Sequence, residues 1–74
     1  INHIYINFKI DGVSRLDLEV FDMNNGNKVY WEENIVNNSK INLNNLPQGF
    51  YIFRITSKNK KILYNLKGIK ITPQ

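Results

Sequence analysis

Leu46-Pro47-Gln48-Gly49-Phe50-Tyr51-Ile52-Phe53-Arg54-Ile55 is a turn signal that runs directly into an alternating strand, and it decides the fold of this chain. Pro47 fixes φ at the second position of a turn, and Gly49 is predicted to take a positive φ that other residues resist. Beyond the turn, successive side chains point to opposite faces of a β-strand. One predicted face carries Tyr51, Phe53 and Ile55, and the other carries Phe50, Ile52 and Arg54.

The same alternation recurs along the whole chain, between turns rich in Asn and Gly. Apolar and polar residues alternate over 3–10, 16–21, 28–33, 41–43, 51–56 and 61–71. Asn and Gly tolerate left-handed backbone, so turns are predicted at Asp11-Gly12, Asn24-Asn25-Gly26-Asn27, Asn37-Asn38-Ser39 and Lys58-Asn59-Lys60. In the last strand the alternation changes phase at Gly68, which predicts a bulge or kink there.

Turn signals about every 8–12 residues between short strands predict a β-sandwich. We expect one domain over residues 1–74: an all-β, antiparallel immunoglobulin-like β-sandwich of about six to seven strands, without a long helix. Tyr51 follows a turn glycine at the start of a late strand, as in a tyrosine corner. Its ring should be buried, with its hydroxyl bonded to the backbone of residues 44–48. The predicted core is Ile6, Phe8, Leu18, Val20, Trp31, Ile41, Tyr51, Phe53 and Ile55.

Composition narrows the class of protein further. The 74 residues are 42% hydrophobic and contain no Cys, which excludes a disulfide or a thiolate-zinc site. No apolar run approaches about 18 residues, so no transmembrane helix is expected, and no signal peptide is visible in the given residues. The chain contains thirteen Asn, eleven Ile and eight Lys but no Ala, a bias typical of AT-rich codons and unfavourable to helices. Because it begins at Ile1, we interpret it as an excised domain or a processed fragment.

The net charge of +4 is unevenly distributed along the chain. Residues 1–33 carry three basic and six acidic groups, whereas residues 34–74 carry seven basic groups and no acidic one. Such a basic half can mark a surface for nucleic acid, membranes or acidic glycans. We favour the simpler interpretation that Lys58, Lys60 and Lys61 decorate a turn and protect sheet edges.

The chain contains few side chains suited to catalysis or metal binding. His3 is the only histidine and has no Cys to pair with. Asp17 and Glu19 share a strand face and are expected to form a solvated polar face beside Arg15, whereas the neighbouring Glu32-Glu33 should point to opposite faces. No catalytic, cofactor-binding or metal-binding residue is therefore predicted, and the protein is not expected to be an enzyme.

The aromatic residues are compatible with two kinds of binding function. Aromatics interleaved with Lys could suit a base-stacking barrel, but they mostly follow the core phase of their strands, so nucleic acid is not an expected partner. The alternative that remains is an immunoglobulin/fibronectin-like accessory or adhesion module that binds carbohydrate or a protein partner. Its exposed aromatic patch would consist of Tyr5, Tyr30 and Tyr64.

The order of four short motifs along the chain is characteristic. They are Ile4-Tyr5-Ile6-Asn7-Phe8; Leu18 to Met23 followed by Gly26, Lys28 and Val29; Leu46-Pro47 with Gly49 and Tyr51; and Lys67-Gly68-Ile69-Lys70-Ile71. In this order the chain resembles the C-terminal sorting domain of type IX secretion system cargo in Bacteroidetes. The family-motif positions are Asp22, Gly26, Pro47, Gly49 and Tyr51. The Tyr-Pro-Asn-Pro-like opening of that family is absent, the Asn24–Asn27 hairpin holds an extra residue, and Gly68 replaces an apolar residue.

The resemblance implies an address rather than a catalyst. It implies export of a parent protein, lying N-terminal to Ile1, across the outer membrane of a Gram-negative bacterium. The implied partners are an outer-membrane translocon, which recognises the domain, and a sortase, which removes it. The candidates for translocon recognition are Lys67, Gly68, Ile69, Lys70 and Ile71. The implied location is the periplasm in transit, then the cell surface or the medium, and no cofactor is implied.

Overall fold

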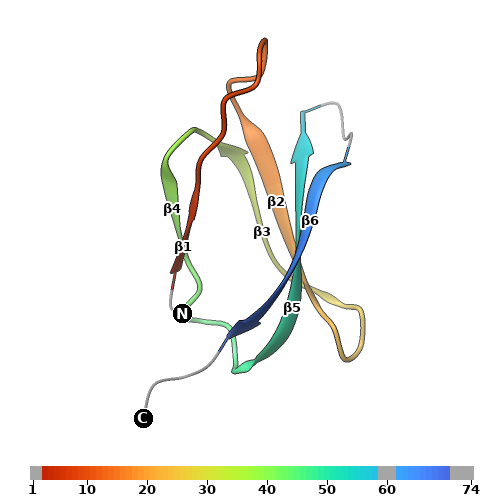
Figure 1. The fold of residues 1–74 in the computed structure, drawn as a ribbon. Helices are drawn as coiled ribbons and strands as arrows, with labels where there is room; N and C mark the ends of the chain where they lie inside the picture. Colours follow the sequence, from red (N-terminus) through yellow and green to blue (C-terminus); the bar gives the residue numbers. More distant parts are fainter. Residues whose placement is uncertain (1–2, 59–61, 71–74) are drawn as a thin grey trace.

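The computed structural model describes residues 3–58 and 62–70, and these residues form six β-strands and no helix (Figure 1). The strands are β1 (His3–Ile6), β2 (Leu16–Asp22), β3 (Lys28–Ile35), β4 (Ser39–Asn42), β5 (Gly49–Ser57) and β6 (Ile62–Lys70). All paired strands are antiparallel. The predicted all-β, antiparallel fold is therefore confirmed.

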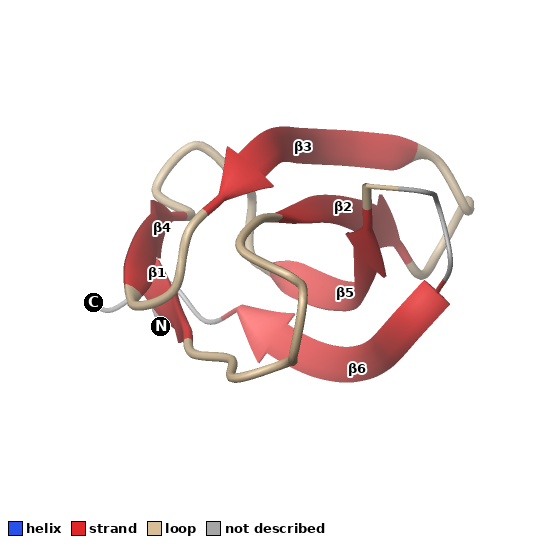
Figure 2. Ribbon diagram, turned by 90° about the horizontal axis from the view of Figure 1, so that it is seen from above, coloured by secondary structure: helices blue, strands red, loops and turns tan. Residues whose placement is uncertain are grey.

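The strands form two sheets, one of β1 and β4 and one in the order β3-β2-β5-β6. Seen from above, the small sheet lies across from the curved larger sheet (Figure 2). These pairings match strands B and E in one sheet, and C′, C, F and G in the other, of an immunoglobulin-like sandwich. Tyr51 thus stands near the start of the strand equivalent to F, where a tyrosine corner belongs.

The core lies between the two sheets and draws on both. Six predicted core residues are buried, namely Ile6, Leu18, Val20, Ile41, Tyr51 and Phe53, while Phe8 and Ile55 are partly buried and pack against them. Cross-strand pairing sets Leu18 opposite Ile55 and Val20 opposite Phe53. Each fully buried aliphatic side chain contributes about 1.5–3 kcal/mol to the free energy of unfolding. These buried cross-strand pairs therefore account for much of the stability of so small a domain.

Trp31 was predicted in the core, and this prediction is wrong because the side chain is 59% exposed. The β2–β3 pairing sets Trp31 opposite Glu19, which points outward, and sets Tyr30 opposite the buried Val20. The register of this pair shifts between Leu16 and Leu18 and again between Val20 and Phe21. Val29 and Trp31 are both exposed whereas Tyr30 is partly buried, so alternation places Val29 and Trp31 together, but this apolar pair faces outward.

Some glycines allow a positive φ in a turn, and others leave room for a neighbouring side chain. Gly12 and Gly26 have φ of 76° and 73°, as the two turn signals predict. Gly49 is not among the positive-φ residues and begins β5, so its predicted role is wrong. The bulge predicted at Gly68 is also wrong: Gly68 pairs in register with Tyr51, and the β5–β6 shift falls between Ile55 and Thr56. Part of the predicted turn at 58–60 lies outside the described residues.

Candidate recognition surface

Tyr51 forms the predicted tyrosine corner. Its side chain is buried, and its hydroxyl donates a hydrogen bond to the carbonyl oxygen of Pro47. Burial, and secondarily the negative charge of Asp22, raises the pKa of Tyr51 above its ordinary value. The hydroxyl therefore stays protonated and ties the β4–β5 connection to the start of β5.

The family-motif residues, scattered along the sequence, meet around this ring. Asp22 and Gly68 are the cross-strand neighbours of Tyr51 on either side. A Cβ on Gly49 would lie 3.8 Å from ring atoms of Tyr51. Gly26 is linked to this cluster through Asp22: it lies in the β2–β3 turn, and its N–H donates a hydrogen bond of 2.8 Å to the Asp22 carbonyl. In this arrangement the motif builds one end of the sandwich.

Gly68 provides space for a core side chain. A Cβ placed there would lie 3.1 Å from Cε2 of Phe53, which is tighter than an ordinary contact. A side chain at position 68 would therefore require the ring of Phe53 to move by a few tenths of an ångström.

Gly68→Val is expected to destabilise the domain by about 1–3 kcal/mol, because the added methyl groups overpack against Phe53. Gly49→Ala is the matched control, since its Cβ would make only an ordinary 3.8 Å contact, and it should stay within about 0.5 kcal/mol of the parent. Urea unfolding midpoints measure both changes. Equal midpoints for the two variants would contradict this packing role of Gly68.

The last strand, β6, is an edge of the larger sheet, because among the described residues it pairs only with β5. Lys67 is exposed and lies opposite Ile52, on the outer face. Ile69 and Lys70 follow on the same strand, paired with Phe50 and Gly49. Ile71 lies outside the described residues. The expectation of an accessible terminal strand is thus confirmed, and recognition of Lys67–Ile71 stays a prediction.

The outer face of the larger sheet, turned away from the core, is cationic and apolar beside this edge. The guanidinium carbon of Arg54 lies 4.9 Å from the ring centre of Phe21, and Phe50 is half exposed. Strands β5 and β6 contain no acidic residue. No ion pair among the described residues involves Arg54 or Lys67. Lys67 therefore presents positive charge next to apolar surface, while Glu19 is the cross-strand neighbour of Arg54.

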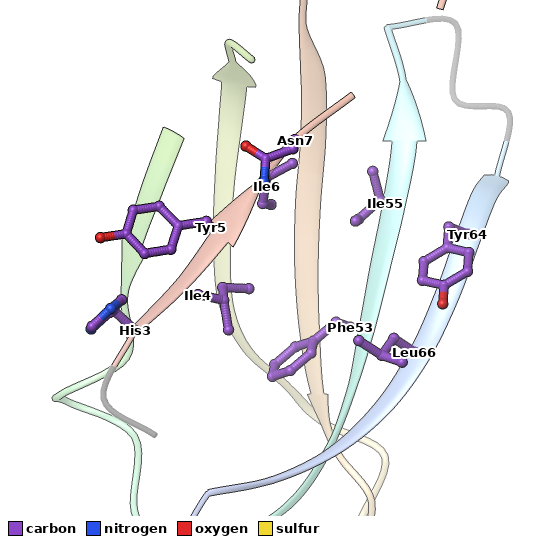
Figure 3. A pocket seen from close by; sticks show the side chains of 9 residues that line it. All are labelled: His3, Ile4, Tyr5, Ile6, Asn7, Phe53, Ile55, Tyr64 and Leu66. Atoms are coloured by element: carbon purple, nitrogen blue, oxygen red, sulfur yellow. The ribbon is translucent and has the colours of Figure 1, made fainter. Parts of the chain in front are cut away.

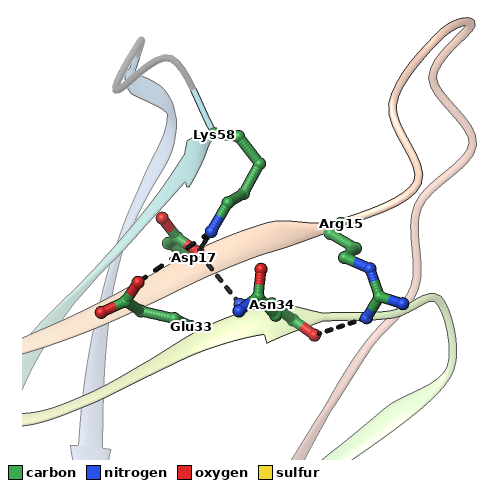
Figure 4. A network of polar contacts seen from close by, with 5 residues as sticks. All are labelled: Arg15, Asp17, Glu33, Asn34 and Lys58. Carbon is green, nitrogen blue, oxygen red and sulfur yellow. Dashed lines mark hydrogen bonds and ion pairs between the residues drawn. The ribbon is translucent and has the colours of Figure 1, made fainter.

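Asp17 is a buried carboxylate, contrary to the predicted solvated face; it is only 2% exposed. Its Oδ1 lies 3.2 Å from Nζ of Lys58 and accepts the backbone N–H of Asn34 over 3.1 Å (Figure 4). Asn34 has a φ of 61°, so Asp17 holds a strained backbone position at the end of β3. Lys58, predicted to decorate a turn, instead neutralises this buried charge, and Lys60 and Lys61 lie outside the described residues.

The acidic residues do not assemble into a chemical site. Glu19 pairs with Lys28 at 3.1 Å, while Asp17 pairs with Lys58 at 3.2 Å, so each carboxylate has its own cationic partner. Within residues 3–58 and 62–70, no group of three or more His, Cys, Asp or Glu side chains could hold a metal ion. The polar contacts that are present support the backbone.

Tyr30 of the predicted aromatic patch is engaged within the fold. Its hydroxyl donates to Oε1 of Glu32 over 2.6 Å, and burial, this hydrogen bond and the charge of Glu32 raise the pKa of Tyr30 to about 12. Tyr5 and Tyr64 are 60% and 54% exposed.

Tyr30 makes the free energy of unfolding depend on pH under alkaline conditions. Its folded pKa of about 12 exceeds the ordinary value of 10.0, so its contribution is fully present below pH 10 and is lost as pH rises through about 12. After solvent screening we expect a loss of roughly 1–2 kcal/mol. Urea unfolding from pH 9 to 12 measures it, and Tyr30→Phe should show a shallower decline. Parallel curves for the two proteins would count against this role.

The fold and its motif cluster define an immunoglobulin-like module with a tyrosine corner and an open terminal strand. Comparison with protein families gives a match to the secretion system C-terminal sorting domain over residues 1–71. The chain therefore belongs to this family, the C-terminal sorting domains of type IX secretion cargo. Neither the curated proteins nor the solved structures contain a match to it.

Membership of this family defines the function as a C-terminal signal for type IX secretion, which sends a cargo protein to the cell surface or beyond. The family is one of sorting signals and is not catalytic. Among the described residues, none belongs to a helix with the length and apolar character needed to cross a membrane. No observation supports the alternative of an adhesion module.

Proposed function

We propose that the translocon of the outer membrane recognises the end of the last strand, through Lys67, Gly68, Ile69, Lys70 and Ile71. The observation that carries this proposal is that β6 is an edge strand, with one row of backbone donors and acceptors unpaired in the described chain. An extended partner segment can add to such an edge through main-chain hydrogen bonds. The translocon then reads a folded, six-stranded domain as its signal.

The distribution of charge also supports recognition at the β6 edge. Lys67 and Arg54 lie on the outer face without an ion pair among the described residues, and the second half of the chain contains no acidic group. Complementary charge speeds encounter and fixes register more than it adds affinity. The partner surface that binds here should accordingly be acidic.

The domain itself supplies no chemistry in this scheme. The parent protein precedes Ile1 and passes through the periplasm, and the domain directs it across the outer membrane. A sortase then removes the domain at the cell surface. The motif residues Asp22, Gly26, Pro47, Gly49 and Tyr51 act indirectly, by maintaining the fold that presents β6.

Reversing the charge of the edge tests the proposal. In a reporter fused to the domain, Lys67→Glu with Lys70→Glu should lower the amount at the cell surface about tenfold, the effect of about 1.4 kcal/mol in recognition. Lys9→Glu with Lys40→Glu is the control, because both lysines are exposed, lie away from β6 and change the net charge equally. This control should be exported normally.

A second arm removes residues 67–74 and checks by circular dichroism that the fusion remains folded. If the folded truncation and the Lys67/Lys70 variant both reach the surface as well as the complete domain, the proposed recognition segment is wrong. A loss of export in the Lys9/Lys40 control as well would assign the effect to overall charge.

A further inference from the structure

Alternate residues of β5 and β6 face in opposite directions, so the larger sheet has two distinct faces. The inner face forms a groove of about 450 Å³ beside β1, lined on this side by Phe53, Ile55, Tyr64 and Leu66 (Figure 3). The outer face carries the residues that alternate with them, namely Ile52, Arg54, Asn65 and Lys67. No described strand covers this outer face, because the small sheet of β1 and β4 lies on the inner side (Figure 2).

The outer face exposes large apolar side chains to solvent. Trp31 and Phe50 are 59% and 53% exposed. Met23, whose N–H donates to the Phe50 carbonyl over 3.1 Å, is 41% exposed. Phe21 is covered by the guanidinium of Arg54 rather than by another strand. Because aromatic residues, Met and Arg are enriched in protein–protein interfaces, this composition favours a protein as the occupant of the face.

The two central strands, β2 and β5, arrange the outer face in rows. Glu19 pairs with Arg54, and Phe21 pairs with Ile52. One row thus joins opposite charges, and the next row joins two apolar side chains. Since the sheet order is β3-β2-β5-β6, both rows straddle the middle of the sheet.

We propose that the outer face binds the same face of a second copy of this chain, about a two-fold axis that runs parallel to the strands between β2 and β5. Such an axis sets β2 of one molecule against β5 of the other, so Glu19 faces Arg54 of the second copy and Phe21 faces its Ile52. A wholly acidic partner would meet Glu19 at the middle of the face, and a wholly basic one would meet Arg54. A second copy matches both charges, as a two-fold contact requires.

The charged groups are available for this contact. Glu19 binds Lys28 through Oε2 at 3.1 Å, which leaves Oε1 to accept from a second molecule. Arg54 has no ion pair among the described residues, and its Nε is buried there without a hydrogen-bond partner. Its guanidinium, held 4.9 Å from the ring centre of Phe21, is preorganised for a carboxylate. Lys28 faces Lys67 of the second copy only at the rim, where water and salt screen the repulsion.

The size of the outer face predicts a weak dimer. Four strands about 4.8 Å apart, each rising about 3.3 Å per residue over the seven residues of β2, give a face of roughly 19 by 23 Å. Contacts of this size fall at the lower end of stable protein interfaces, so we expect a dissociation constant of roughly 10–100 μM. The inference goes beyond the proposed function, because a contact between sheet faces leaves the hydrogen-bonding edge of β6 free for the translocon.

Charge exchange tests the proposal by analytical ultracentrifugation of this chain from about 1 μM to about 1 mM. Glu19→Arg and Arg54→Glu should each weaken the dimer at least about tenfold, because like charges then meet across the axis. Mixed in equal amounts, the two variants should form a heterodimer, since each acidic pair of positions then meets a basic pair. Asp11→Arg and Lys40→Glu are the controls: they make the same changes of charge at exposed positions off the outer face and should dimerise like the parent chain.

The unsubstituted chain provides a second measurement, which decides the matter if a charge variant does not fold. Trp31 is the one tryptophan, and it pairs with Glu19, so in the dimer it faces Asn65 of the second copy. Acrylamide quenching of its fluorescence should therefore fall about twofold between the lowest and highest concentrations. A chain that stays monomeric at about 1 mM, or a dimer that leaves Trp31 equally accessible, would overturn the proposal. Folded charge variants that dimerise alone, or that fail to pair when mixed, would also overturn it. None of these measurements depends on export.

Discussion

Tyr51→Ala is expected to cost about 3–5 kcal/mol and to leave much of the domain unfolded at 37 °C, because it empties a core position and removes the corner hydrogen bond. The ring is 3% exposed and packs at the meeting point of β2, β5 and β6. Tyr51→Phe keeps the ring and loses only the bond to Pro47, so it should cost about 0.5–1.5 kcal/mol.

Urea unfolding followed by Trp31 fluorescence measures both variants. Because Trp31 lies on the outer face, its signal reports unfolding without being part of the substituted site. An unchanged midpoint in Tyr51→Phe, or equal losses in the two variants, would contradict the assignment of the corner bond.

Asp17→Ala is expected to cost about 2–3 kcal/mol. The substitution removes a buried acceptor of the Asn34 amide and the partner of Lys58, and hydrogen bonds to charged groups are each worth about 1.5–3 kcal/mol. The ion pair itself adds little, because the side chain of Lys58 is 47% exposed.

Glu33→Gln is the matched control for Asp17. Glu33 also approaches Lys58, but at 4.0 Å and with a side chain that is 62% exposed, so the change should stay within about 0.5 kcal/mol. A cost for Asp17→Ala no larger than that of the control would show that the buried carboxylate does not support the β2–β3 end.

The sequence was sufficient for the fold because alternation and turn chemistry agree over most of the chain. Leu18, Val20 and Phe53 lie where a period of two places them. Trp31 lies on the outer face although its neighbours in sequence alternate regularly, and Asp17 keeps an unbroken register with β5 yet is buried beside the β2–β3 register shift between Leu16 and Leu18. A bulge depends on pairing between two strands, which a single-strand pattern does not contain.

The glycines show a second limit of the sequence. Gly49 and Gly68 were predicted from backbone conformation, whereas the structure gives neither a positive φ. Gly68 is matched to the ring of Phe53, a contact between two strands that sequence spacing does not reveal.

Of the candidate site, the sequence predicted the motif residues and the terminal strand but not the groove. The groove exists because the small sheet has only two strands in the described chain, so Tyr64 and Leu66 keep the core phase without core burial. Alternation reports which face a residue occupies, and it contains no information on whether another strand covers that face.

The most direct measurement of the central claim is the location of a periplasmic reporter carrying residues 1–74 and their natural upstream segment, in a host with a type IX secretion system. The reporter should reach the cell surface with the domain, and stay in the periplasm without it or in a strain that lacks the translocon. Tyr51→Ala, which disrupts the folded signal, should also retain it. A reporter that stays in the periplasm with a folded domain, or reaches the surface equally without the translocon, would contradict the account.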